Sequence, residues 1–321
     1  MLKITYLTCE SLTNPLGIDA RRPRFCWQIQ SERRNVLQTA YRIQASADAA
    51  FESFIWDSGR IESDQSLYVE YDGAPLASRA RYFYRAKAWD NSGSESDWSD
   101  AAWWEMGILS PAEWKARWLT YPFKENPKEY KPAYYFRKTF QVTKDLKRVR
   151  VYASALGLYE VHLNGQRLGD ELFTPGLTEY GHHIQYQIYS ADLVPGPNVI
   201  GVVLGEGWYR GRFQIKGRNT WGKTGAIFLQ IHIEYQDGSE EPVVTDQTWK
   251  VSTGPLLRSD LYDGEDYDAR LETDWLNPDF DDRSWASAKI HSRYPVSRLV
   301  ATIRIHRSVS SSRPAARLSP R

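Results

Sequence analysis

The sequence is poor in the residues on which several classes of protein depend. Its 321 residues include two cysteines, Cys9 and Cys26. Two cysteines cannot build a disulfide framework, so we expect reduced, buried thiols. Both fall on predicted strands of one sandwich, so a single disulfide bridge between them is the alternative. No apolar run approaches the ~18 residues of a membrane helix, and the N-terminus lacks the pattern of a signal peptide. We therefore expect no membrane partner and a cytoplasmic location.

Patterns that bind metals or phosphates are scarce as well. His182 and His183 are adjacent, but no cysteine lies near them, and zinc requires three or four converging ligands. Segment 217–224 has the letters of a phosphate loop, but no helix is predicted after it. The acidic run 260–274 lacks the spacing of a calcium loop, and we interpret it as a solvated face. From these motifs we expect no catalytic residue.

Aromatic residues, in contrast, are abundant. They make up 14% of the chain, with 13 tryptophans and 20 tyrosines. Such an excess fits β-sandwiches, and it also fits surfaces that face sugars. A chain of this length predicts about two domains, each large enough for its own core.

The first predicted domain spans residues 5–107. Strand-like runs alternate apolar and polar positions and are separated by turn-rich segments; they lie at 25–29, 40–45, 66–70 and 82–89. Tyr82 follows Leu76 by six residues, which is the spacing of a tyrosine corner. This order resembles a fibronectin type III domain, a family that carries no chemistry of its own. We expect Trp27 and Trp89 to fill its core.

The second predicted domain spans residues 133–290 and follows a proline-punctuated linker, 108–132. Its strand-like runs include 149–153, 158–163 and 199–204. Asn164-Gly165 is a strong hairpin signal between two such runs. Because strand follows strand without room for crossover helices, we predict an antiparallel jelly roll. The fold class is thus all-β, a fibronectin type III-like sandwich followed by a jelly-roll sandwich.

Several motifs, in this order and spacing, resemble the N-terminal, non-catalytic region of bacterial α-L-rhamnosidases. They are LNGQRLGD at 163–170, TPGLTEY at 174–180, GEGWYRG at 205–211, DGEDYDAR at 263–270 and FDDRSW at 280–285. The resemblance implies that the second domain is a galactose-binding-like sandwich. It also implies that the full-length family hydrolyses terminal α-L-rhamnosides by inversion, with acidic residues of an (α/α)6 barrel that this chain does not contain. An inverting enzyme needs two opposed carboxyl groups, so we expect this chain alone to be inactive.

Segment 205–211 is the best candidate for carbohydrate binding. Trp208 and Tyr209 offer flat faces to a sugar ring, and Arg210 could donate to its hydroxyls. The competing interpretation is a glycine-rich loop that closes the sandwich and needs no ligand. Because related rhamnosidases can bear a calcium-dependent rhamnose site, we also nominate Asn164 and Glu206, although Leu163 offers no oxygen ligand. The expected partner is an L-rhamnose-containing glycan or glycoside, with no cofactor other than calcium.

The C-terminal segment 291–321 is basic. It contains seven arginines and no Lys, Asp or Glu, so the rest of the chain carries 34 basic and 40 acidic residues. We predict a disordered tail and hypothesise a frameshifted or truncated gene product. A nucleic-acid-binding arm would rest on charge alone, so we expect no nucleic-acid partner.

Three functions stay open at this point. The chain is the accessory half of an α-L-rhamnosidase-like enzyme, a stand-alone carbohydrate-binding module, or a structural scaffold that docks a separate catalytic chain.

Overall fold

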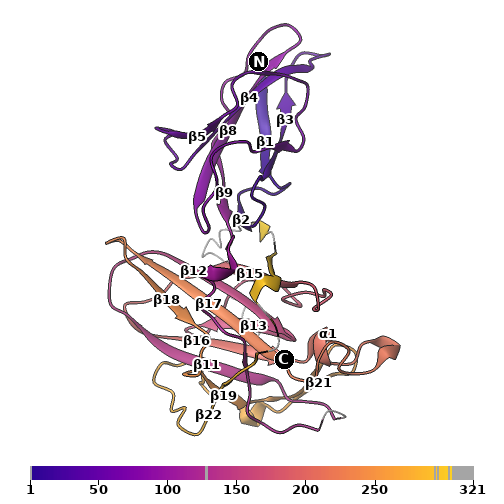
Figure 1. The fold of residues 1–321 in the computed structure, drawn as a ribbon, viewed down its shortest axis with the longest axis vertical. Coiled ribbons are helices and arrows are strands. Elements are labelled where there is room, and N and C mark those ends of the chain that lie inside the picture. Colours follow the sequence, from indigo (N-terminus) through magenta and orange to yellow (C-terminus); the bar gives the residue numbers. More distant parts are fainter. Residues whose placement is uncertain (1, 127–128, 293, 295, 303, 306–321) are drawn as a thin grey trace, which may run out of the picture. The chain divides into compact units, whose positions relative to one another are not determined.

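The regular secondary structure of the described residues consists almost entirely of β-strands. The computed structural model describes residues 2–126, 129–292, 294, 296–302 and 304–305. They form two compact units, one from residues up to 107 with 304–305, and one from residues 108–302. Figure 1 shows strands throughout, with a few single helical turns. The all-β prediction is therefore confirmed.

The first unit is a sandwich of two sheets. One sheet has the order β1 (Lys3–Cys9), β3 (Arg24–Gln30) and β7 (Val69–Glu70). The other has the order β25 (Arg304–Ile305), β2 (Pro15–Ile18), β9 (Ala102–Met106), β8 (Arg81–Asp90), β4 (Gln38–Ser46) and β5 (Phe54–Asp57), and β6 (Ile61–Glu62) also pairs with β4. Burial alternates along the whole of β8, because successive side chains of a strand point to opposite faces.

Aromatic side chains fill the core of the first unit. The Phe25 ring lies 4.5 Å from Tyr84 and 5.3 Å from Trp104, centroid to centroid. The Tyr82 hydroxyl accepts the backbone N–H of Ala77 at 2.9 Å, as a tyrosine corner predicts. These contacts tie the two sheets together.

The predictions for the first unit's tryptophans and cysteines have different outcomes. Trp27 is buried and donates to Gln38 Oε1 at 2.9 Å, so its predicted core position is confirmed. The prediction for Trp89 is wrong, because the alternation of β8 turns it outward, where the Arg60 guanidinium lies 4.7 Å from its ring centroid. Cys9 and Cys26 are free and buried, as expected, and burial raises the pKa of the Cys9 thiol.

The second unit contains a seven-stranded sheet, a six-stranded sheet and a separate hairpin. The first sheet has the order β23 (Lys289–Ile290), β10 (Leu119–Thr120), β17 (Ala226–Tyr235), β12 (Leu146–Leu156), β15 (Ile184–Ser190) and β24 (Leu299–Ala301), with β18 (Glu240–Val244) also on β17. The second has the order β14 (Gln166–Arg167), β13 (Leu158–Leu163), β16 (Gly196–Gly205), β11 (Tyr134–Val142), β19 (Lys250–Thr253) and β22 (Ala286–Ser287). The hairpin pairs β20 (Leu256–Asp260) with β21 (Gly264–Tyr267).

Short helical turns complete this unit. They are η1 (Pro111–Glu113), α1 (Gly207–Arg210), η2 (Gln214–Lys216), η3 (Ala269–Leu271) and η4 (Val296–Arg298). Among the described residues, no helix is long and apolar enough to cross a membrane.

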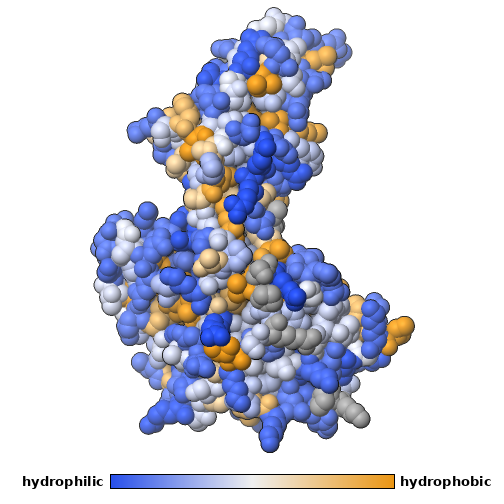
Figure 2. Space-filling view, in the orientation of Figure 1, coloured by the Kyte–Doolittle hydropathy of each residue, from blue (hydrophilic) through white to orange (hydrophobic). Residues whose placement is uncertain are grey.

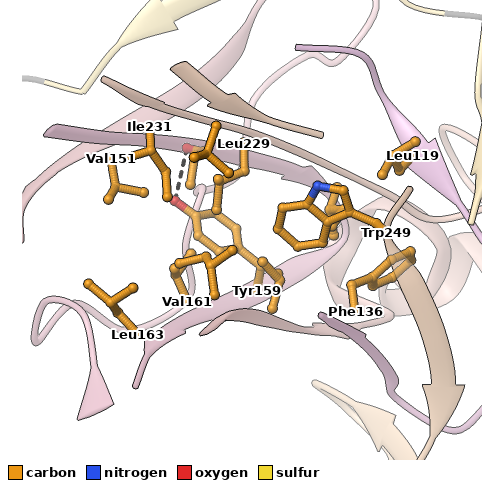
Figure 3. Packing of buried hydrophobic residues seen from close by; sticks show 14 of the residues in the cluster. Leu119, Phe136, Val151, Tyr159, Val161, Leu163, Leu229, Ile231 and Trp249 are labelled. Atoms are coloured by element: carbon orange, nitrogen blue, oxygen red, sulfur yellow. Dashed lines mark hydrogen bonds between the residues drawn. The ribbon is translucent and has the colours of Figure 1, made fainter. Parts of the chain in front are cut away.

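Apolar side chains from both sheets form the larger of two buried clusters in the second unit; the smaller one includes Trp118, Tyr180 and Phe228. Figure 3 shows Tyr159 pointing into the larger cluster, near Val161 and Leu229. The Tyr159 hydroxyl is satisfied inside the core, because it donates to the Ala153 carbonyl at 2.9 Å. Trp249 is fully buried, and its indole N–H donates to the Val244 carbonyl at 2.8 Å. Each buried polar atom of these two rings thus has a partner, as low-dielectric surroundings require.

A long segment without strands, residues 272–285, lies against the second sheet of this unit. Trp275 packs over Gly201, where an added Cβ would come within 2.6 Å of the ring. Arg137, with 1% of its side chain exposed, forms an ion pair with Asp282. Its Nε donates to the Trp275 carbonyl and its Nη2 to the Asn277 carbonyl, both at 3.0 Å. One buried guanidinium therefore holds three points of the segment.

The predicted linker, 108–132, belongs to the second unit. Leu119 of β10 pairs with Ile227 on one side and Ile290 on the other, so β10 lies inside the sheet. Trp118, Leu119 and Tyr121 are buried. The sequence does not reveal this strand, because two residues are too few to show the alternation of a strand.

Two short strands of the C-terminal segment are paired into sheets, whereas we predicted disorder for the whole segment. β24 runs parallel to β15, with Ile184 opposite Leu299, and β25 pairs with β2. Backbone hydrogen bonding, which composition does not report, orders these residues. The remainder of the tail, from 306 onward, lies outside the described residues.

Candidate functional site

The glycine-rich segment 205–211 follows β16 and forms the single turn α1. Gly207 has a φ of 55°, a conformation that glycine adopts most easily. A Cβ added to Gly207 would lie 2.7 Å from Leu158 Cγ. Glycine is therefore required here because α1 approaches the start of β13 closely, and a ligand is not needed to explain it.

Five charged side chains, which we call the charged cluster, are joined by ion pairs at α1. They are Glu125, Glu206, Arg210, Arg218 and Asp260. Arg210 donates to Glu125 Oε2 at 2.9 Å, and its Nε lies 3.6 Å from Glu206 Oε1. Arg218 donates to Asp260 Oδ2 at 3.0 Å and also to Glu206 Oε2. The two guanidiniums thus join three carboxylates.

Burial dominates the electrostatics of the charged cluster. The Glu206 side chain is 3% exposed, and loss of hydration raises the pKa of its carboxyl group, although Arg218 and Arg210 act in the opposite direction. Burial lowers the pKa of Arg210, but Tyr121, Glu125 and Glu206 outweigh it, so the pKa is raised and Arg210 stays charged. The cluster is an internal ion-pair network that fixes α1 to the sandwich.

The candidate residues of α1 point in different directions. Tyr209 is fully buried, and its hydroxyl donates to the Tyr294 hydroxyl at 3.2 Å. Arg210 is 3% exposed and is held by the charged cluster. Trp208 is half-buried, with its ring 5.9 Å from that of Phe173. Of the described residues of α1, Trp208 is thus the aromatic one that solvent reaches.

Asn164 lies at the other end of β13 from the charged cluster. Its φ is 48°, as the hairpin turn requires. Its side-chain amide donates to Asn198 Oδ1 and accepts the N–H of Val199, both at 2.8 Å. Glu206 follows Gly205, which pairs with Leu158 at the far end of the same ladder, so about 20 Å of strand separates the two.

This separation corrects our joint nomination of Asn164 and Glu206 as calcium ligands. Calcium contacts its oxygen ligands at about 2.3–2.6 Å, so one ion cannot reach both residues. Across the part of the chain that the structure describes, no group of three or more His, Cys, Asp or Glu side chains could hold a metal ion.

Sequence reasoning missed part of the charged cluster. Asp260 belongs to the acidic run that we interpreted as solvated, but its side chain is fully buried and accepts the N–H groups of Arg212, Tyr262 and Asp263. Glu125 and Arg218 had no role in the sequence analysis. Glu125 lies 85 residues from Arg210, and Arg218 lies 12 residues from Glu206 and 42 from Asp260. These separations match no motif, so the sequence could not have indicated the pairing.

The fold and the charged cluster together define a class of protein. The chain consists of two β-sandwich units, and the carboxylates of the charged cluster are buried and paired with arginines. This is the architecture of an all-β protein made of sandwich domains, a class whose fold alone does not specify a function.

Family comparisons identify the region. Residues 144–307 match the family described as the α-L-rhamnosidase N-terminal domain, and residues 4–110 match the Rha78A-like, N-terminal immunoglobulin domain. The chain belongs to the α-L-rhamnosidase N-terminal domain family. For the first unit the matched family is named after the immunoglobulin domain, which shares its two-sheet architecture with the fibronectin type III domain that we expected.

Individual relatives agree with this assignment. An α-L-rhamnosidase of Formosa agariphila is 33% identical over 307 residues, which cover 91% of this chain and 33% of the relative. The structure of an α-L-rhamnosidase from Dictyoglumus thermophilum has a TM-score of 0.85 at 33% identity, covering 93% of this chain and 35% of that one. The structure of the Streptomyces avermitilis α-L-rhamnosidase complexed with L-rhamnose has a TM-score of 0.84 at 25% identity, covering 91% of this chain and 45% of that one. The chain spans about a third to under half of the length of these proteins.

Proposed function

We propose that this chain is an accessory, non-catalytic region of an α-L-rhamnosidase and works with a catalytic domain on L-rhamnose-containing glycosides. The observation that carries this proposal is the match of residues 144–307 to the N-terminal domain family. The Formosa agariphila relative is about three times as long as the region it shares with this chain, which leaves room for a separate catalytic domain.

The chemistry of the charged cluster supports a role without turnover. Glycoside hydrolysis requires one carboxyl group that protonates the leaving oxygen and a second that activates water or attacks the sugar. Glu206 and Asp260 are buried and ion-paired with Arg218, so neither reaches a substrate.

Between a scaffold and a sugar-binding module, the second unit favours the scaffold. All four residues of β21 are exposed, and Tyr262 and Tyr267 are 48% and 51% exposed. A two-stranded hairpin is marginally stable alone, and exposed aromatic groups are typical of interaction surfaces. Glu265 and Asp266 are exposed on the same hairpin, where Asp266 is already paired with Arg258 at 2.9 Å. Because Glu265 adds a negative charge to this surface, we propose that a catalytic domain covers it with a surface that includes a basic residue.

A turnover assay tests the accessory role. Purified chain is incubated with an aryl α-L-rhamnoside, with the Formosa agariphila enzyme as the positive control. We expect no release of the aryl group by this chain. Turnover by the chain alone would refute the proposal. Its retention after Glu206→Gln and Asp260→Asn would place the chemistry outside the charged cluster, and its loss would place the chemistry within it.

A chimera tests the docking hairpin. The chain replaces the matched N-terminal third of the Formosa agariphila enzyme, and soluble yield and turnover are measured. The double variant Tyr262→Ser, Tyr267→Ser is expected to lower both, whereas Leu172→Ser, at a position that is 69% exposed elsewhere in the second unit, leaves them unchanged. Equal behaviour of the two variants in an active chimera would contradict docking at the hairpin.

A further inference from the structure

The first unit contains a pocket that the proposed function does not use. Its volume is about 570 Å³, and it is lined by residues of the edge strands β5, β6 and β7 and their flanking segments. β7 ends one sheet of the sandwich, whereas β5 and β6 lie at the edge of the other. The pocket therefore lies at the edge of the sandwich, where neither sheet has a further strand.

Aromatic side chains form one part of the lining. They come from Tyr41, Trp56 and Tyr68. Tyr68 is 50% exposed, and its backbone is anchored because its N–H donates to Cys26 Sγ at 3.2 Å. Trp56 is fixed from behind by the Tyr71 ring, 5.4 Å away between centroids. The Arg24 guanidinium lies over the Tyr68 ring, 5.0 Å from its centroid, so a ligand that stacks on Tyr68 uses the opposite face of the ring.

Charged side chains form another part of the lining. Arg22 donates from Nη2 to Asp72 Oδ1 at 2.9 Å, and its Nε lies 3.7 Å from Glu70 Oε2. The same Nε donates to the Tyr71 carbonyl at 3.2 Å, which fixes the guanidinium. One cation and two carboxylates give this part of the lining a net negative charge, which disfavours phosphate and other anions.

We propose that this pocket binds one neutral sugar residue of a glycan. A pyranose has an apolar face that can stack on Tyr68 or Trp56, and hydroxyl groups that can donate to Asp72 and Glu70 and accept from Arg22. The volume lies within the range of small-molecule sites, about 300–1,000 Å³. A quaternary ammonium ligand would also suit aromatic rings and carboxylates. Arg22 already neutralises one of the two carboxylates, which makes the pocket less favourable for a cation. This site is in the first unit and does not depend on the proposed role of the second.

The test is titration calorimetry of the full chain with the methyl glycosides of L-rhamnose, D-galactose and D-glucose. Tetramethylammonium and inorganic phosphate serve as comparison probes. We expect at least one glycoside to bind, and neither ion to bind. Loss of the stacking ring in Tyr68→Ala is expected to weaken that affinity by about tenfold, and Asp72→Asn by about fivefold.

The chain offers a matched control for Tyr68. Tyr6 is also a tyrosine of the first unit, it is 66% exposed, and its φ of 51° is close to the 54° of Tyr68. It does not line the pocket. Tyr6→Ala should therefore change glycoside affinity less than twofold while altering the backbone in the same way, and near-ultraviolet circular dichroism shows whether each variant is folded.

The outcomes separate clearly. No glycoside binding, binding of only tetramethylammonium or phosphate, or equal glycoside affinity in Tyr6→Ala and Tyr68→Ala would each overturn the sugar site. None of these results bears on turnover or on the chimera, so this inference and the proposed function can fail independently.

Discussion

Replacing Arg137 by Met should release the segment 272–285 from the second unit. Arg137 is the buried guanidinium that joins this segment at Asp282 and at the carbonyl groups of Trp275 and Asn277. Met keeps most of the volume of the aliphatic stem but donates no hydrogen bond. The substitution therefore removes polar contacts while largely preserving packing.

The contacts give the size of the effect. Hydrogen bonds that involve a charged group contribute about 1.5–3 kcal/mol each. Water recovers part of this loss, because the Asp282 side chain is 27% exposed and can hydrate. Breaking a buried ion pair costs about 3–5 kcal/mol, and we take the lower end, about 3 kcal/mol. That corresponds to a roughly 100-fold increase in the population in which the segment is open.

Hydrogen exchange measured by mass spectrometry on peptides from 272–285 checks this value. The control is Arg283→Met in the same segment, because Arg283 pairs with Asp281 but its side chain is 90% exposed. An exposed pair contributes only about 0–1 kcal/mol, so the control should exchange almost as the parent chain does. Equal exchange in the two variants would refute the reasoning that burial gives the Arg137 contacts their strength.

Three further predictions concern single positions. Gly201→Ala places a methyl group against Trp275 and should lower the free energy of unfolding, measured by urea denaturation, by about 2 kcal/mol. An unchanged midpoint of urea denaturation would contradict the close packing. Glu206→Gln should lower the free energy of unfolding by about 2 kcal/mol and leave the glycoside affinity in calorimetry unchanged. A loss of glycoside affinity without a loss of stability would instead assign Glu206 to a sugar site. Arg42 lowers the pKa of Asp57 below its ordinary 3.8, so this carboxylate stabilises the first unit above about pH 4, and the stabilisation disappears as the pH falls further. The stability difference between the parent chain and Asp57→Asn, measured by thermal unfolding, should therefore shrink from pH 6 to pH 2, and a constant difference would contradict it.

The strands that the sequence predicts are those with a long alternating pattern. Burial alternates along β8, which has ten residues, and along β13, which has six, and both were expected as strands. β7 lies within the predicted run 66–70, whereas β10 and β6 have two residues each, which is too short to display a period of two. Their positions depend on partner strands elsewhere in the chain, as the pairing of β10 with both β17 and β23 illustrates.

The site residues were harder to predict because a motif gives residue types but not directions. In 205–211, glycines and aromatic residues fit a ligand loop and a closing turn equally well. The turn of α1 directs Tyr209 and Arg210 inward, and the partners that make this favourable, Glu125 and Tyr294, lie 85 residues away in each case. Only the folded chain brings these partners together.

The two units differ in which polar and aromatic side chains a ligand can reach from solvent. In the second unit, the most distinctive polar and aromatic motif is used internally, since Arg210 and Glu206 satisfy each other's charge and that of their neighbours. In the first unit, short edge strands leave Tyr68 half exposed beside Arg22 and Asp72. A short strand that covers little of its neighbour leaves side chains of both sheets accessible at the edge. The binding surface of the first unit therefore arises from incomplete sheet coverage, which no motif in its sequence marks.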